Sequence, residues 1–269
     1  MQTKYSYREI KASLPKEKNA MSSLWVRLWV RKASFVVTWL FLRFGWTANK
    51  VSIFSWFFAL AGGVLLCLDE FIFRFAGCIF LNAWLVLDCV DGNIARTTKH
   101  KTLMGEFFDA AAGYGVCIFS AMGIGMAAYH TSYLVPLEDR PYLLHCATVW
   151  VMADMCMRLV HQKYLNCYFM AKMILQEPEG IVSDSHPSPN QRDFSYIKKR
   201  ISSNLGPSGL LMPWLLIALF TNTFDILLIF YTAFYVVSFF TMFFIDCRKA
   251  WNFGEESQEK YETILLEGD

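Results

Sequence analysis

One stretch in the first half of the chain combines carboxylates, an arginine and very small residues at fixed spacing. In order, these residues are Asp88, Asp91, Gly92, Ala95, Arg96, Gly105 and Asp109. The charged members lie at the edges of apolar runs, where a charge is costly and therefore indicates a functional site. On a helix, Asp88 and Asp91 are three residues apart and project from one face, so the two carboxylates can share a cation.

Gly105 and Asp109 are four residues apart, which places them on one face of a second helix. The two segments together offer three hard oxygen donors, and such ligands suit Mg²⁺ or Mn²⁺ better than Zn²⁺. A small residue such as Gly92 lets a ligand approach the backbone closely. The stretch therefore predicts a metal site beside a pocket that could accept a metal-bound diphosphate.

The pattern D-x2-D-G-x2-A-R-x8-G-x3-D resembles the signature of the CDP-alcohol phosphotransferase family. Members of this family are membrane enzymes that cleave a CDP-activated donor and pass its phospho-alcohol part to an acceptor hydroxyl, releasing CMP. The resemblance implies catalytic carboxylates that hold the metal and small residues that line the nucleotide pocket. These residues are Asp88, Asp91 and Asp109 for the metal, and Gly92, Ala95 and Gly105 for the pocket. The family resemblance also implies a homodimer with one site in each chain.

The family signature ends with a further aspartate, and this chain departs from it there. Seven of the eight signature positions match, and the eighth is Gly113. In the family the missing aspartate belongs to the second metal site and acts as the general base. Three explanations stay open: the acceptor is already anionic, Asp154 or Glu106 substitutes for the base, or turnover has been lost.

Two further features extend the expected nucleotide site. Arg96 is always charged and fork-shaped, which suits a phosphate of the donor. The resemblance also implies a short polar motif just before the first span, and Thr47, Asn49 and Ser52 occupy that place. We expect Thr47 and Asn49 to contribute to binding of the CDP-linked donor.

Composition identifies the chain as a membrane protein. Of 269 residues, 55% are hydrophobic and 18% are charged, which is too apolar for an ordinary soluble domain. The eight cysteines show no C-x-x-C spacing and indicate neither a disulfide framework nor a zinc site. The polar first twenty residues lack a signal-peptide pattern. We expect an all-α integral membrane protein whose partners are the bilayer and a CDP-linked donor, with no nucleic acid.

Hydropathy predicts six transmembrane helices preceded by an amphipathic interfacial helix. The predicted spans are residues 51–68, 71–90, 107–129, 142–161, 209–220 and 226–245. Before them, residues 23–46 carry four tryptophans beside four cations, which favours a helix lying in the interface over an extra tilted span. The predicted regions are a cytosolic arm and interfacial helix (1–46), a six-helix transmembrane catalytic domain (47–247) and an acidic cytosolic tail (248–269).

The basic residues predict the orientation of these spans. With six spans, 23 of the 25 Lys and Arg residues fall on the side of the Asp88–Asp109 motif, and only Arg74 and Arg140 fall opposite. Positively charged loops stay in the cytosol, so we expect the active site to face the cytosol. A nucleotide-activated donor is a cytosolic metabolite, which agrees with this orientation.

Asp154 and Arg158 are the remaining charged pair inside a predicted span. They are four residues apart on one helix face. Two interpretations stand for them, a mutually neutralising pair and a polar wall of the acceptor site.

Four functions are compatible with some of these features. The first is a metal-dependent transferase that uses a CDP-activated alcohol or CDP-diacylglycerol, and the second is a non-catalytic protein that keeps the CDP and metal pocket. A transporter fits poorly, because its carboxylates would lie at midplane and these cluster at one edge. A prenyltransferase would use aspartate-rich metal sites but would not explain the Gly-x-x-Ala-Arg continuation.

Overall fold

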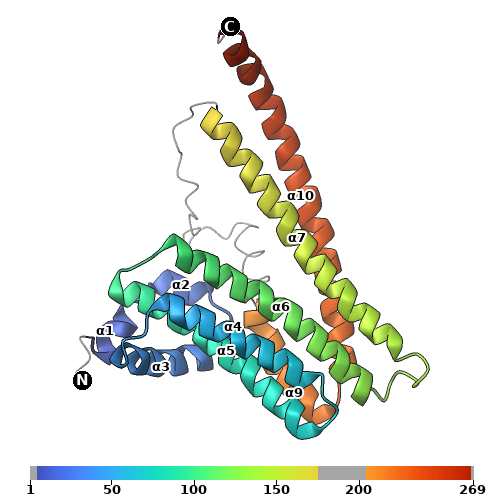
Figure 1. The fold of residues 1–269 in the computed structure, drawn as a ribbon. Coiled ribbons are helices and arrows are strands. Elements are labelled where there is room, and N and C mark those ends of the chain that lie inside the picture. The colour runs from blue at the N-terminus through green and yellow to red at the C-terminus, as the bar shows by residue number, and fades with distance from the viewer. Residues whose placement is uncertain (1–4, 175–203, 268–269) are drawn as a thin grey trace. The chain divides into compact units, whose positions relative to one another are not determined.

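The computed structural model describes residues 5–174 and 204–267, and every regular element among them is a helix (Figure 1). The elements in chain order are α1 (Tyr7–Ala12), α2 (Lys16–Met21), η1 (Val26–Val30), α3 (Arg31–Arg43), α4 (Ala48–Leu66), α5 (Phe71–Thr98), α6 (Leu103–Thr131), α7 (Pro141–Ile174), η2 (Pro207–Leu211), α9 (Met212–Thr221) and α10 (Phe224–Glu267). The prediction of an all-α protein is confirmed for these residues.

Five of the helices are long and apolar enough to cross a membrane. They are α4, α5, α6, α7 over Pro141–Met173 and α10 over Phe224–Asn252. The predicted span at 209–220 corresponds to the shorter apolar stretch Pro207–Thr221, which is not among the five. Its first turns, η2, are kinked at Gly209, where the backbone departs from helical angles. The chain is therefore a multi-pass membrane protein, and the predicted span at 209–220 is not confirmed.

The chain divides into two compact units. The first contains residues 1–148 and 189–229, and the second contains residues 149–188 and 230–269. The whole signature lies in the first unit, whose centre is formed by α4, α5 and α6 side by side (Figure 1).

Small residues let these three helices approach closely. A Cβ atom added at Gly63 on α4 would lie 2.6 Å from the Phe119 carbonyl oxygen on α6. One added at Gly123 on α6 would lie 2.7 Å from the Gly63 carbonyl oxygen. Because both distances are below van der Waals contact, neither position has room for a side chain, and the α4–α6 crossing requires glycine at both.

Helix α5 is longer than the predicted span and carries the signature to its last turn. It ends where Lys99 adopts a left-handed conformation with φ 54°, and the His100 amide donates to the Ala95 carbonyl oxygen at 3.2 Å. Two residues later the Thr102 side chain caps α6 by accepting from the Gly105 amide at 3.0 Å. This short connection brings the first turns of α6 next to the end of α5.

Helix α3 differs from the interfacial helix expected over residues 23–46. Its buried residues include Arg31, Ser34 and Thr38, at i, i+3 and i+7, so a polar stripe faces the protein. The preceding turn, η1, is a π-helix. Because α3 packs its polar stripe against α5, the amphipathic interfacial helix is not confirmed.

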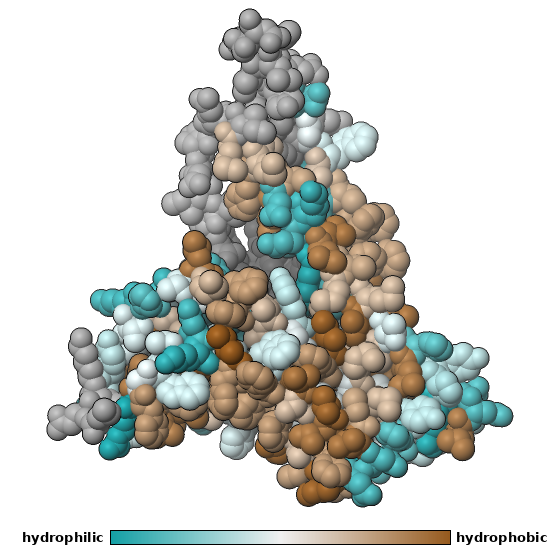
Figure 2. All heavy atoms as spheres, viewed as in Figure 1, coloured by the Kyte–Doolittle hydropathy of each residue, from teal (hydrophilic) through white to brown (hydrophobic). Residues whose placement is uncertain are grey.

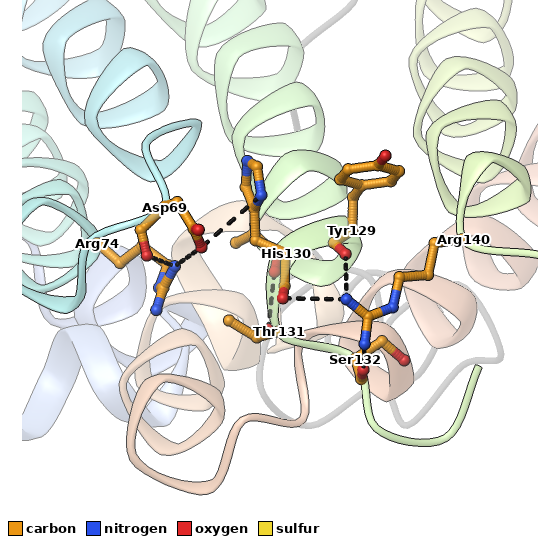
Figure 3. A network of polar contacts seen from close by, with 8 residues as sticks. Asp69, Arg74, Tyr129, His130, Thr131, Ser132 and Arg140 are labelled. Atoms are coloured by element: carbon orange, nitrogen blue, oxygen red, sulfur yellow. Dashed lines mark hydrogen bonds and ion pairs between the residues drawn. The ribbon is translucent and has the colours of Figure 1, made fainter. Parts of the chain in front are cut away.

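A separate polar network closes the opposite ends of α5 and α6 (Figure 3). Arg74 donates to the Asp69 carbonyl oxygen and, at 3.2 Å, to the Asp69 carboxylate, which also lies 3.7 Å from His130. Arg140 donates to the carbonyl oxygens of Tyr129 and His130, at 3.2 Å each, and to that of Ser132. Arg140 therefore supplies donors to carbonyls that the end of α6 leaves unpaired.

In the second unit, α7 and α10 run parallel to each other. The Trp150 ring stacks on the rings of Tyr231 and Tyr235, with centroid distances of 5.3 and 5.4 Å. Further along the same two helices, His161 Nδ1 lies 3.0 Å from Asp246 Oδ2. Helix α10 continues to Glu267, so the segment expected to be an acidic tail is largely helical.

Apolar side chains cover the outer faces of the long helices. Phe57 and Val64 on α4 are exposed, as are Val237 and Phe240 on α10. Figure 2 shows hydrophobic residues over much of the visible face. Such surfaces are expected where lipid replaces water as the solvent.

Candidate functional site

Asp91 is held in place by a serine from the preceding helix. The Ser52 hydroxyl on α4 donates to Asp91 Oδ2 on α5 at 2.6 Å, and both side chains are buried. Ser52 belongs to the polar motif expected just before the first span. The structure therefore brings that motif and the signature together through a short, charge-assisted hydrogen bond.

Asn49, from the same motif, contacts the other half of the signature. Its side-chain amide exchanges hydrogen bonds of 3.3 Å with the Thr102 hydroxyl, which caps α6. A Cβ atom added at Gly105 would lie 2.8 Å from Asn49 Oδ1, so the close contact requires a glycine there. Thr47 is exposed at the N-cap of α4 and makes no side-chain capping bond.

Arg96 is positioned by Asn93, an amide that lies inside the signature. Arg96 Nη2 donates to Asn93 Oδ1 at 2.8 Å, and Asn93 Nδ2 donates to the hydroxyls of Ser34 and Thr38 on α3 at 3.2 Å each. The guanidinium folds over Gly92, where an added Cβ would lie 3.1 Å from Nη1. Because Gly92 has no side chain, the Arg96 guanidinium has room to lie over it.

Asp88 and Asp109 complete the expected carboxylate set. Asp88 is partly exposed near the end of α5, Asp109 is exposed in the second turn of α6, and the charges of these residues and Asp91 interact. Their oxygens suit Mg²⁺ or Mn²⁺. Among the residues that the structure describes, however, no three His, Cys, Asp or Glu side chains already lie close enough to hold a metal ion. The carboxylates meet at one end of the bundle without forming a coordination shell.

The comparison with protein families agrees with this geometry. The family model described as CDP-alcohol phosphatidyltransferase matches residues 45–176, which contain the polar motif and all eight signature positions, Gly113 included. This stretch of 132 residues, just under half of the chain, is similar to the CDP-alcohol phosphatidyltransferase family. Among curated proteins no match to the chain is found. The family supports membrane phosphotransferase activity in general.

At the position where the CDP-alcohol phosphatidyltransferase signature has its last aspartate, the structure leaves space. A Cβ atom added at Gly113 would meet no other atom within 4 Å. Glu106, one of the two substitutes considered for the base, is exposed one turn before Asp109, and its charge acts on that residue.

The other substitute, Asp154, is already paired. Arg158 Nε donates to both carboxylate oxygens of Asp154, at 3.0 and 3.1 Å, and Asp154 is completely buried. Both residues lie in the second unit. The pair matches the first of the two interpretations, a mutually neutralising helix pair, while a role in acceptor binding stays a prediction.

Two cations from the first forty residues also lie at the signature, and sequence analysis did not assign them to the site. Arg31 is only 7% exposed, and its Nη2 donates to the Ser22 hydroxyl at 3.2 Å. Lys18 is exposed on α2. Partial desolvation lowers the pKa of the Lys18 ammonium, and the positive charges of Arg96, Arg31 and Lys101 lower it further. The polar stripe of α3 was the signal that could have revealed Arg31.

Proposed function

We propose that the chain is a metal-dependent membrane transferase that moves the phospho-alcohol group of a CDP-linked donor to an acceptor hydroxyl and releases CMP. The observation that carries this proposal is the convergence of the expected polar motif and the signature. The Ser52 hydroxyl donates to Asp91 at 2.6 Å, while Asn49 bonds Thr102 and lies so near Gly105 that a Cβ atom there would be 2.8 Å from its Oδ1. Sequence-distant residues of a nucleotide and metal site thus lie at one end of α4, α5 and α6.

In this proposal Asp88, Asp91 and Asp109 hold Mg²⁺ or Mn²⁺. Bound divalent ions would neutralise charge on the bridging and leaving oxygens of the diphosphate. Ser52 fixes the direction of one Asp91 carboxylate oxygen, and Arg96, held by Asn93, donates to a phosphate of the donor. Gly92, Ala95 and Gly105 leave room for the nucleotide, and Thr47 and Asn49 border it.

The reaction makes and breaks one bond to phosphorus. The acceptor oxygen bonds to the phosphorus that carries the alcohol, and the bond from this phosphorus to the bridging oxygen breaks. CMP leaves with that electron pair, and the acceptor hydroxyl loses its proton. Glu106 is the best-supported base, because its carboxylate is exposed near Asp109.

The orientation and the assembly also belong to the proposal. The site is proposed to face the cytosol because, in the six-span prediction, 23 of the 25 Lys and Arg residues fall on its side. The two arginines expected on the other side, Arg74 and Arg140, both have structural partners. The homodimer implied by the resemblance stays a prediction.

The second candidate is a protein that binds CDP and metal without turnover, favoured by Gly113. One experiment separates the two. CDP binding is measured by calorimetry on the purified protein with Mg²⁺ and with excess EDTA, and CMP release is followed with CDP-linked donors over a panel of acceptors. We expect binding only with the metal and CMP release with at least one acceptor. Undiminished binding in EDTA would overturn the metal site, and binding without CMP release would favour the second candidate.

Matched variants sharpen this test. Asp91→Asn and Asp109→Asn should weaken Mg²⁺-dependent CDP binding and leave the melting temperature of the metal-free protein nearly unchanged. Asp139→Asn, an exposed carboxylate between α6 and α7, serves as the control and should change neither. A collapsed fold in the Asp109→Asn variant would instead mean that this carboxylate is structural.

A further inference from the structure

Arg31 is a buried cation whose charge is not balanced by an ion pair. Its side chain makes one hydrogen bond, from Nη2 to Ser22, and its Nε is buried with no partner among the described residues. Within the same residues, no carboxylate oxygen lies within the 4.0 Å that defines an ion pair with Arg31. Burying an unpaired charge is expensive, which indicates that a ligand completes this environment.

Hydrogen bonds place Arg31 beside Arg96. Arg31 lies one turn before Ser34 on α3, Ser34 accepts from Asn93, and Asn93 in turn accepts from Arg96. The two guanidinium groups therefore lie on neighbouring positions where α3 crosses α5. Arg31 and Arg96 are close enough for their charges to act on each other.

The segment before α3 adds Lys18 to the pair. Two contacts pack this segment against the helices, a 3.3 Å hydrogen bond between the hydroxyls of Ser13 and Thr97, and an edge-on contact of the Tyr7 and Phe35 rings. Ser22, the partner of Arg31, accepts from Arg31 and donates to the Lys18 carbonyl oxygen at 2.9 Å. Lys18 is exposed, so solvent can reach the cluster from this side.

We propose that Arg31 and Lys18 form a phosphate-binding subsite beside Arg96, carried by the segment that precedes the first span. Its ligand is a phosphate group other than the donor diphosphate, carried either by a soluble phosphate ester that serves as the acceptor or by a lipid headgroup. The inference rests on the proposed function and deepens it, because a phosphate held beside Arg96 would belong to the acceptor or to a lipid next to the donor site. Three cations that converge from α2, α3 and α5 suit a phosphate with several oxygens.

The test uses inorganic phosphate as the probe and contains no metal. The full chain is purified in a phosphate-free maltoside detergent with EDTA, and phosphate binding is followed by 31P NMR line broadening. We expect Arg31→Gln and Lys18→Gln each to weaken binding about tenfold or more, because each removes a charge-assisted hydrogen bond. Lys32→Gln makes the same charge change at an exposed position next to Arg31 and should bind as the wild type does.

Two further measurements keep the outcome clear. Arg31→Lys retains the charge and should keep most of the binding, and Lys18→Gln alters an exposed residue, so loss of binding there cannot be attributed to unfolding. Competition by glycerol 3-phosphate supports a soluble phosphate ester, whereas competition by added phosphatidylglycerol supports a lipid headgroup. Absent phosphate binding, equal binding by all variants, or competition by neither compound overturns the subsite.

The result is independent of the proposed function. Mg²⁺-dependent CDP binding is measured on the same preparations. If CDP fails to bind while phosphate binding depends on Arg31 and Lys18, the transferase proposal falls and the subsite stands. If CDP binds while phosphate does not, only the subsite falls.

Discussion

The hydroxyl of Ser52 lies 2.6 Å from Asp91 Oδ2, so a residue just inside α4 fixes a carboxylate near the end of α5. Ser52→Ala removes the only side-chain donor that the structure gives to Asp91 among the described residues. We expect Mg²⁺-dependent CDP binding to weaken about tenfold, since a hydrogen bond to a charged group contributes about 1.5 to 3 kcal/mol. Calorimetry checks this.

Ser55→Ala is the matched control for that variant. Ser55 is also buried on α4, but its hydroxyl donates to the Ser52 carbonyl within the same helix. It should leave CDP binding unchanged. Equal losses in the two variants would show that the effect comes from α4 as a whole.

Gly105→Ala tests the contact between α4 and α6. The new methyl group would lie 2.8 Å from Asn49 Oδ1 and 3.1 Å from Thr102 Oγ1, so the polar motif must move away from the signature. We expect weaker CDP binding and a lower melting temperature. Gly113→Ala adds the same methyl group to α6 in open space, and it should leave both quantities at the wild-type value or slightly raise the melting temperature.

Gly113→Asp restores the carboxylate that the signature lacks. Because nothing lies within 4 Å of the added Cβ, the variant should fold. We expect tighter Mg²⁺ binding and faster CMP release with a neutral hydroxyl acceptor, because a positioned base contributes about a hundred- to ten-thousand-fold in rate. Gly113→Asn has the same shape without the charge and should show neither gain. A Gly113→Asp protein that is indistinguishable from Gly113→Asn would argue against a catalytic site.

Arg140→Gln tests the cap at the other end of α6. The side chain donates to three backbone carbonyls, and shortening it leaves them without these donors. We expect a loss of about 1 to 3 kcal/mol of folding free energy, the cost of unsatisfied buried acceptors. Thermal melts in detergent measure it, with Glu138→Gln, an exposed neighbour, as the control. A melting temperature equal to that of the control would mean that water replaces the guanidinium at no cost.

Lys18 provides a prediction about pH. Partial desolvation, together with the charges of Arg96, Arg31 and Lys101, lowers its pKa in the folded protein below the usual 10.5. Above the folded pKa, the unfolded chain holds a proton that the folded protein has released, so stability rises with pH up to the unfolded value. The melting temperature of the wild type should therefore rise relative to that of Lys18→Gln as the pH approaches 10.5. Lys16→Gln, which removes an exposed cation from the same helix, is the charge-matched control.

Much of the site followed from sequence because its residues obey short-range periodicity. Asp88 and Asp91 are three residues apart, Gly105 and Asp109 are four apart, and helical spacing alone places each pair on one face. The polar motif before the first span was expected to join them, and Ser52 bonds Asp91 while Asn49 bonds Thr102, the residue that caps α6.

Arg31 could not be assigned in the same way. A short helix with cations and tryptophans has the composition of an interfacial helix. The polar face of α3 is buried because Ser34 and Thr38 accept hydrogen bonds from Asn93, which lies more than fifty residues later in the chain. The predicted span at 209–220 is not confirmed, for a local reason. Residues 207–221 are apolar, but the kink at Gly209 limits their regular helix to the ten residues of α9.

The amide of Asn93 limits which side chains its position can accept. Its nitrogen supplies two hydrogen bonds to α3 and its oxygen receives one from Arg96, so every polar atom of a fully buried group is engaged. An aspartate at this position could not donate the two hydrogen bonds to α3, and a leucine could make none of the three. A glutamine is longer by one methylene group. Although the signature leaves this position unspecified, a saturation library of the chain should find it nearly as intolerant of substitution as the aspartates two and five residues before it.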